Sequence, residues 1–240
     1  MNYIHHKYFY KSRIEKTFLI FFFLIFFDTL YAQKPIQDFQ LWQNCEIEYN
    51  FNLRWSGHLQ EQVRLTENDS RFSYSYYDIG TSYRVAKNIR LSLDYILVEK
   101  QKLDFTFSTR NQYNIYLNFR KRVDRITFFD RVLTEGQFTD FSTSKSGKQL
   151  GDVYMRNKIS ARYKLISKLS AYVSDEVYFK LDGVIHERGF NRNRLSSGLL
   201  YKLSDYWLLE TFYLFEDNFS SPMPTQNFVV GVGISKSFFQ

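Results

Sequence analysis

The chain has 240 residues, and its composition is typical of a β-rich protein. Aromatic residues make up 20% of it, and the abundant Phe and Tyr favour pleated, half-buried strands. The mean hydropathy of -0.39 argues against a bundle of membrane-spanning helices, whereas a transmembrane barrel is polar on average because half of each strand faces its lumen. The net charge of +7 comes from basic residues spread along the chain, so we expect no nucleic-acid partner.

The first predicted element is a signal peptide at residues 1–32. Basic residues precede a short apolar run, Phe18–Phe27, and Ala32 then provides a small residue before Gln33. The run is about half the length that a membrane-spanning helix needs, so an uncleaved anchor is the less favoured alternative. We therefore expect export, with residues 33–240 forming a single domain.

The rest of the chain divides into strand-like segments. Most are longer than the usual globular strand of about five or six residues, and they suit the roughly nine to eleven residues of a tilted membrane strand. We expect strands at residues 39–51, 55–66, 73–85, 89–100, 110–121, 125–136, 152–164, 169–179, 191–203, 207–216 and 226–238.

The connections between these segments alternate between short turns and long loops. This is typical of outer-membrane barrels, in which the short turns are periplasmic. Aromatic residues beside the short turns, such as Trp55 and Trp207, fit the girdles at the membrane interfaces. An odd strand number conflicts with the even number of single-chain bacterial barrels, so we expect about ten to twelve strands. Either a strand near the N-terminus is missed or split, or segment 36–51 stays outside the wall.

Alternation along the strands assigns a lipid face and a lumenal face. Val153, Met155 and Ile159 fall on one side of an extended strand, whereas Arg156 and Lys158 fall on the other. A charge on the lipid face would cost about 2–4 kcal/mol near the midplane, so the charged side should face inward. The sequence thus predicts an all-β, antiparallel, up-and-down transmembrane barrel. Its candidate lumenal charge network consists of Arg64, Arg84, Arg120, Arg156, Arg162, Glu176, Arg192, Arg194 and Glu210.

Opposite charges inside a narrow barrel should pair, because an unpaired buried charge is costly. Glu176 and Glu210 lie on the strands that flank Arg192 and Arg194, so we expect an Arg–Glu ladder there. Glu176 is also the first candidate partner for Arg156 on the preceding strand. We favour a polar plug that holds the barrel closed over a selectivity or binding site in a channel, because small barrels fill their interiors with side chains.

The sequence offers little for catalysis or metal binding. His58 is predicted to face inward and His186 lies in a long loop, and neither has a Ser or Asp at a spacing that supports a triad. No metal-ligand spacing is present, and a single cysteine, Cys45, excludes an internal disulfide. We therefore expect no cofactor and no metal. A barrel hydrolase that acts on lipid or peptide through one of these histidines is the alternative.

Short motifs distributed over residues 38–238 carry a family resemblance. They are Asp38–Trp42, Glu61–Arg64, Arg156–Lys158, Val173–Glu176, Phe190–Arg194 and Gly198–Tyr201. In these motifs the chain resembles an uncharacterised family of bacterial outer-membrane barrels, domain of unknown function 2490. The resemblance implies a barrel in the outer membrane and no established activity.

These features together predict a non-enzymatic outer-membrane barrel with a structural or small-solute role. We expect outer-membrane lipid around a monomeric barrel, and the barrel-assembly machinery as a partner during insertion. A secreted, soluble ligand-binding barrel is a further alternative. It would have an apolar interior and a polar exterior, the inverse of the pattern in these strands.

Overall fold

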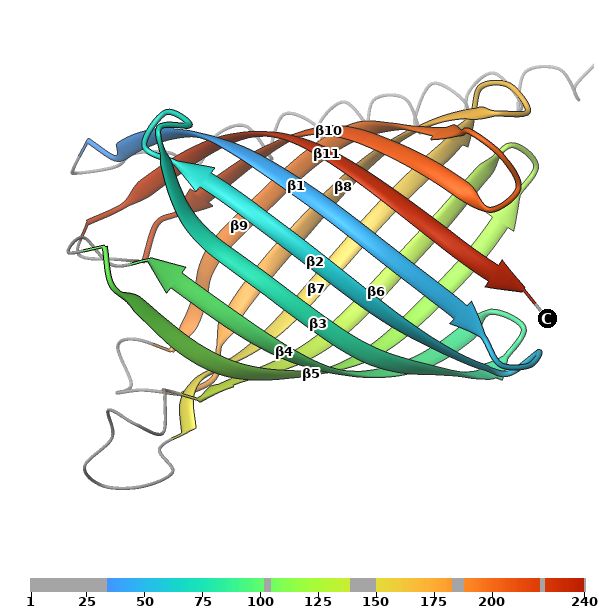
Figure 1. The fold of residues 1–240 in the computed structure, drawn as a ribbon, viewed down its shortest axis with the longest axis horizontal. Coiled ribbons are helices and arrows are strands. Elements are labelled where there is room, and N and C mark those ends of the chain that lie inside the picture. Colours follow the sequence, from blue (N-terminus) through green and yellow to red (C-terminus); the bar gives the residue numbers. More distant parts are fainter. Residues whose placement is uncertain (1–33, 102–104, 139–149, 183–187, 221–222, 240) are drawn as a thin grey trace, which may run out of the picture. The chain divides into compact units, whose positions relative to one another are not determined.

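A computed structural model describes residues 34–101, 105–138, 150–182, 188–220 and 223–239. The strands in these residues form one closed barrel (Figure 1). Their bounds are β1 Ile36–Asn50, β2 Trp55–Thr66, β3 Arg71–Ala86, β4 Ile89–Gln101, β5 Phe107–Val123, β6 Ile126–Phe138, β7 Leu150–Lys164, β8 Leu169–Lys180, β9 Gly189–Lys202, β10 Trp207–Asn218 and β11 Thr225–Phe239. Each predicted strand is present, with its ends within a few residues of the prediction. The predicted signal peptide, residues 1–32, lies outside the described residues.

The strands follow the chain order around the wall, and consecutive strands are antiparallel. Closure is the exception, because β1 pairs with β11 in parallel, from Ile36 opposite Thr225 to Asn50 opposite Phe239. Figure 1 shows the two strands side by side and pointing the same way. The all-β barrel of ten to twelve strands is therefore confirmed. Segment 36–50 belongs to the wall, and the parallel seam accommodates the odd count of eleven strands in the described residues.

Strand length and side-chain distribution are those of a transmembrane barrel. The shortest strands have 12 residues, which is enough for a tilted strand to cross the hydrocarbon core. Large apolar side chains are exposed on the outer face, among them Leu59 at 56%, Ile79 at 57% and Ile159 at 58%. Polar side chains such as Asn114 and Glu176 are buried inside. Among the described residues, no helix is long and apolar enough to cross a membrane.

A small apolar cluster interrupts the polar interior beside the parallel seam. Trp42 of β1, Leu214 of β10 and Val229 of β11 are buried together, and Phe212 packs against them. These side chains fill the lumen next to β1 and β11. They leave the polar side chains of the other strands to shape the remaining interior.

Candidate functional site

Two cavities in the described part of the chain lie along the lumen. The larger has a volume of about 800 Å³ and reaches the long-loop end of the barrel, where Lys100, Asp152 and Thr225 line it. The smaller, of about 240 Å³, is lined toward the short-turn end by Ser160 and Arg162. Four side chains line both cavities and therefore lie between them. We call them the constriction; they are Arg131, Lys158, Tyr172 and Glu210.

The constriction is held by hydrogen bonds from neighbouring strands. The Tyr172 hydroxyl donates to Glu210 Oε1 at 2.6 Å and so bridges β8 and β10. Gly198 of β9 lies between these strands, and a Cβ at that position would overlap the Tyr172 ring. Gly198 thus gives Tyr172 the space to reach across β9 and narrow the lumen. In the same constriction, Arg131 Nε donates to Asn118 Oδ1 at 2.9 Å.

A continuous set of ion pairs lines the larger cavity from β6 to β10. Arg156 Nη1 contacts Glu135 Oε2 at 2.6 Å, and Arg156 Nε and Nη2 donate to Glu176 Oε1 at 3.0 and 2.7 Å. Arg194 Nε donates to Glu216 Oε2, and its Nη1 lies 3.9 Å from Glu176 Oε2. We call this set, together with Arg192, the ion-pair belt.

The carboxylates of the belt are buried, and an aromatic ring lies against its cations. Arg192 joins it through Glu216 Oε2, 3.9 Å from Arg192 Nη1. The centroid of the Tyr178 ring lies 4.3 Å from the Arg156 guanidinium, 4.9 Å from that of Arg192 and 5.0 Å from that of Arg194. Because the carboxylates are more than 90% buried, salt screens these pairs much less than it screens surface pairs.

Arg64 presents a different kind of positive charge to the larger cavity. Its guanidinium lies 3.7 Å from the Trp42 ring centroid and 4.3 Å from that of Tyr76. Its Nε and Nη2 donate to Gln62 Oε1, an amide oxygen, at 2.9 and 2.7 Å. Two rings and an amide hold this cation in place without neutralising its charge.

The structure brings together part of the predicted charge network. Arg156, Glu176, Arg192 and Arg194 meet in the ion-pair belt, and Arg64 and Arg194 both approach the Trp42 ring. The other members lie elsewhere. Arg162 and Glu210 line the smaller cavity, Arg120 and Arg162 face the Phe129 ring, and Arg84 is exposed at the short-turn end.

The predicted ladder has a different carboxylate from the one expected. Glu210 lies opposite Leu200, whereas Glu216 lies directly opposite Arg194. Because of this antiparallel register, Arg192 and Arg194 pair with Glu216, whereas Glu210 accepts a hydrogen bond from Tyr172. Glu216 and Glu135 were not predicted as lumenal partners. Both occupy inward positions in the alternation of side chains along their strands, and this could have identified them.

The two histidines give no support to the hydrolase alternative. His58 faces the interior, where it contacts Asp78 and Asp94, and both are carboxylates rather than nucleophilic hydroxyls. His186 lies outside the described residues.

Comparison with known proteins identifies a family and a fold. Residues 39–227 match the model of a family described as "Protein of unknown function (DUF2490)". No curated protein matches the chain. Among solved structures, the barrel is similar to one described as "NanC porin structure in rhombohedral crystal form", with a TM-score of 0.51 and 10% sequence identity. The similarity covers 84% of this chain and 99% of that chain, and at this identity it supports the transmembrane barrel fold alone.

Proposed function

The chain belongs to the DUF2490 family, whose function is unknown, and from the geometry of the lumen we propose an outer-membrane barrel that takes up small anionic solutes. The observation that carries the proposal is the larger cavity. Its volume of about 800 Å³ falls within the roughly 300–1,000 Å³ of small-molecule sites. Its lining is polar and reaches the long-loop end, so a solute that arrives there meets hydrogen-bonding groups.

The charges of the cavity favour an anion. Among the described residues that line it, eight are Arg or Lys and six are Asp or Glu. The belt pairs its own arginines with carboxylates, but the nearest hydrogen-bond acceptor of Arg64 is the Gln62 amide. Arg64 is therefore the cation best placed to attract a carboxylate or phosphate group, for which a guanidinium supplies paired donors.

Passage of a solute through the barrel is restricted. The constriction separates the two cavities, so a solute held in the larger one must displace Tyr172 or Lys158 to reach the smaller one. The lumen is thus largely plugged, and we propose slow, selective handling rather than free diffusion. No enzymatic step is part of the proposal.

The cellular setting completes the proposal. We place a monomeric barrel in the outer membrane, surrounded by lipid, with its short turns in the periplasm. Export would use residues 1–32 as a signal peptide, and insertion would use the barrel-assembly machinery. The apolar outer face and the alternation of turns and loops support this placement.

Solute uptake into proteoliposomes tests the proposal. The purified protein should admit labelled gluconate, a small anion, faster than glucose. Arg64→Gln should slow gluconate uptake more than glucose uptake, because it removes the positive charge that attracts the anion and retains a polar group. Arg54→Gln, which makes the same change in the exposed β1–β2 turn, is the matched control and should have no effect. Uptake no faster than in protein-free liposomes, or equal slowing of both solutes by Arg64→Gln, would overturn the proposal.

A further inference from the structure

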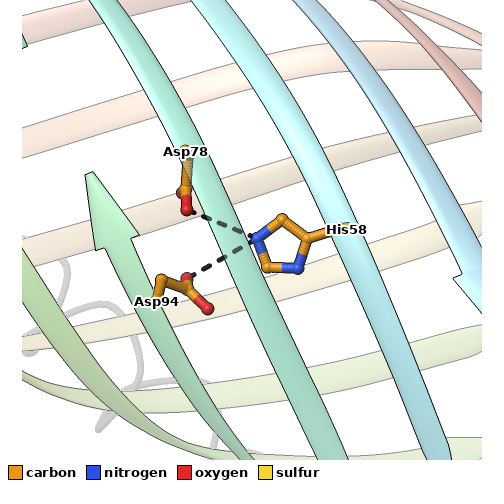
Figure 2. Close-up of side chains that lie close together, drawn as sticks. All are labelled: His58, Asp78 and Asp94. Atoms are coloured by element: carbon orange, nitrogen blue, oxygen red, sulfur yellow. Dashed lines mark ion pairs between the residues drawn. The ribbon is translucent and has the colours of Figure 1, made fainter. Parts of the chain in front are cut away.

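Three potential metal-binding side chains converge on the inner wall of β2, β3 and β4. They are His58, Asp78 and Asp94, one from each strand (Figure 2). One ligand atom from each lies within 4.8 Å of the other two. Figure 2 shows both carboxylates turned toward the same edge of the imidazole ring.

A glycine at the centre of the cluster allows this convergence. His58 lies opposite Gly80 in the β2–β3 pairing, and Gly80 lies opposite Asp94 in the β3–β4 pairing. A Cβ at position 80 would overlap both the Asp94 carboxylate and the His58 ring. Because the middle strand has no side chain at this level, the side chains of its two neighbours lean over it. Asp78, two residues earlier on the same face of β3, closes the third side.

The polar atoms of the cluster are close together but are not satisfied by one another. His58 Nε2 lies 3.6 Å from Asp78 Oδ1 and 3.7 Å from Asp94 Oδ2, and both distances are too long for hydrogen bonds. Asp78 Oδ1 and Asp94 Oδ1 are buried without a hydrogen-bond partner among the described residues. The Asp94 side chain is only 6% exposed. Buried carboxylate oxygens without partners are costly, so a cation or a hydrogen-bond donor bound between them would stabilise the cluster.

A divalent transition-metal ion fits the cluster in chemistry and in size. One imidazole and two carboxylates are a donor set for Zn²⁺, which in open sites takes three protein ligands and keeps a position for water. Ligand atoms about 2.1 Å from one tetrahedral zinc lie roughly 3.4 Å apart, close to the separations between His58 Nε2 and the two carboxylates. Asp78 also lines the larger cavity, so an ion can reach the cluster from the lumen.

We propose that His58, Asp78 and Asp94 form a lumenal binding site for a divalent transition-metal ion. No metal was expected from the sequence, because the ligands come from three strands and have no motif spacing. Strand register brings them together, and Gly80 removes the side chain that would separate them. The proposed metal site contains neither Arg64 nor a residue of the constriction. The zinc experiments can therefore fail or succeed independently of the proposed solute uptake.

Zinc binding to the untagged protein, purified from membranes in detergent, tests the proposal. The experiments use a background with His5→Gln, His6→Gln and His186→Gln, so that His58 is the one histidine in the chain. Isothermal titration with ZnCl₂ should show one site per chain. Loss of an outer-shell partner already costs about 10- to 100-fold in metal affinity, so Asp94→Asn should weaken binding by at least about 10-fold. Gly80→Ala should also weaken it, because the added methyl group displaces two ligands without removing either.

Asp152→Asn is the matched control. It makes the same change in the wall of the larger cavity at β7, where Asp152 contacts Lys180 at 3.0 Å, and zinc affinity should not change. Equal weakening by Asp152→Asn and Asp94→Asn would show non-specific attraction of cations and overturn the proposal. Zinc-edge X-ray absorption of this background protein, whose one histidine is His58, covers the case in which the other variants do not fold. An imidazole nitrogen in the zinc shell supports the site, and a shell without one refutes it.

Discussion

Glu176→Gln is the sharpest test of the ion-pair belt, because it removes one charge and keeps the shape of the side chain. Glu176 accepts two hydrogen bonds from Arg156 and also contacts Arg194 at 3.9 Å. Breaking a buried ion pair by removing one partner costs about 3–5 kcal/mol. Arg156 keeps Glu135 and Arg194 keeps Glu216, so the loss should lie near the lower end, about 3 kcal/mol.

Urea unfolding in detergent or lipid vesicles, followed by tryptophan fluorescence, measures this loss. Trp42 contacts Arg194 of the belt and reports on its surroundings. Glu48→Gln provides the comparison, because the Glu48–Arg90 pair is partly exposed and such pairs contribute about 0–1 kcal/mol. If Glu176→Gln lowered the free energy of unfolding no more than Glu48→Gln does, the ion-pair belt would not stabilise the barrel.

Two further predictions concern packing and the lipid face. Gly231→Ala should destabilise the barrel by about 1–3 kcal/mol, because the new Cβ would overlap the Phe212 ring. Gly233→Ala in the same strand meets its nearest atoms at 3.6 Å, and equal unfolding midpoints for the two variants would contradict this packing. Leu199→Arg, on the outer face of β9, should cost about 2–4 kcal/mol in lipid vesicles, whereas Leu53→Arg in the β1–β2 turn should cost little. A similar cost for both leucine variants would mean that Leu199 does not face the hydrocarbon.

The strands and their faces could be predicted from the sequence because they depend on local alternation. A period of two places Val153, Met155 and Ile159 on one side and Arg156 and Lys158 on the other, whatever their neighbours are. In a membrane the apolar side then faces outward, because charged side chains are costly on the lipid face. Long strands joined alternately by short turns and long loops were enough to predict the barrel.

The parallel seam could not be predicted in this way, because it depends on which strands meet when the sheet closes. Local patterns in β1 and β11 say nothing of their pairing direction. The expectation of an even strand number came from known barrels rather than from the chain. Parallel pairing of Ile36–Asn50 with Thr225–Phe239 closes the sheet without a further strand.

The lumenal contacts depended on register, which sequence alternation leaves open. Glu216 rather than Glu210 pairs with Arg194 because the register across β9 and β10 places it directly opposite. The same dependence hid the cluster around His58, which exists only because Gly80 lies between His58 and Asp94. Counting register outward from the short β9–β10 turn would have found the Glu216 pairing. The same counting misses the His58 cluster, because the β2–β3 and β3–β4 pairings each contain a register shift.

Single-channel current across a planar lipid bilayer shows whether the constriction limits passage through the lumen. The wild-type protein should give small current steps, and Tyr172→Ala should enlarge them, because it removes the ring that reaches across Gly198 to Glu210. Tyr163→Ala makes the same change on the outer face of β7 and should leave the steps unchanged. Steps that are equal in the wild type and in Tyr172→Ala would mean that the constriction does not limit passage.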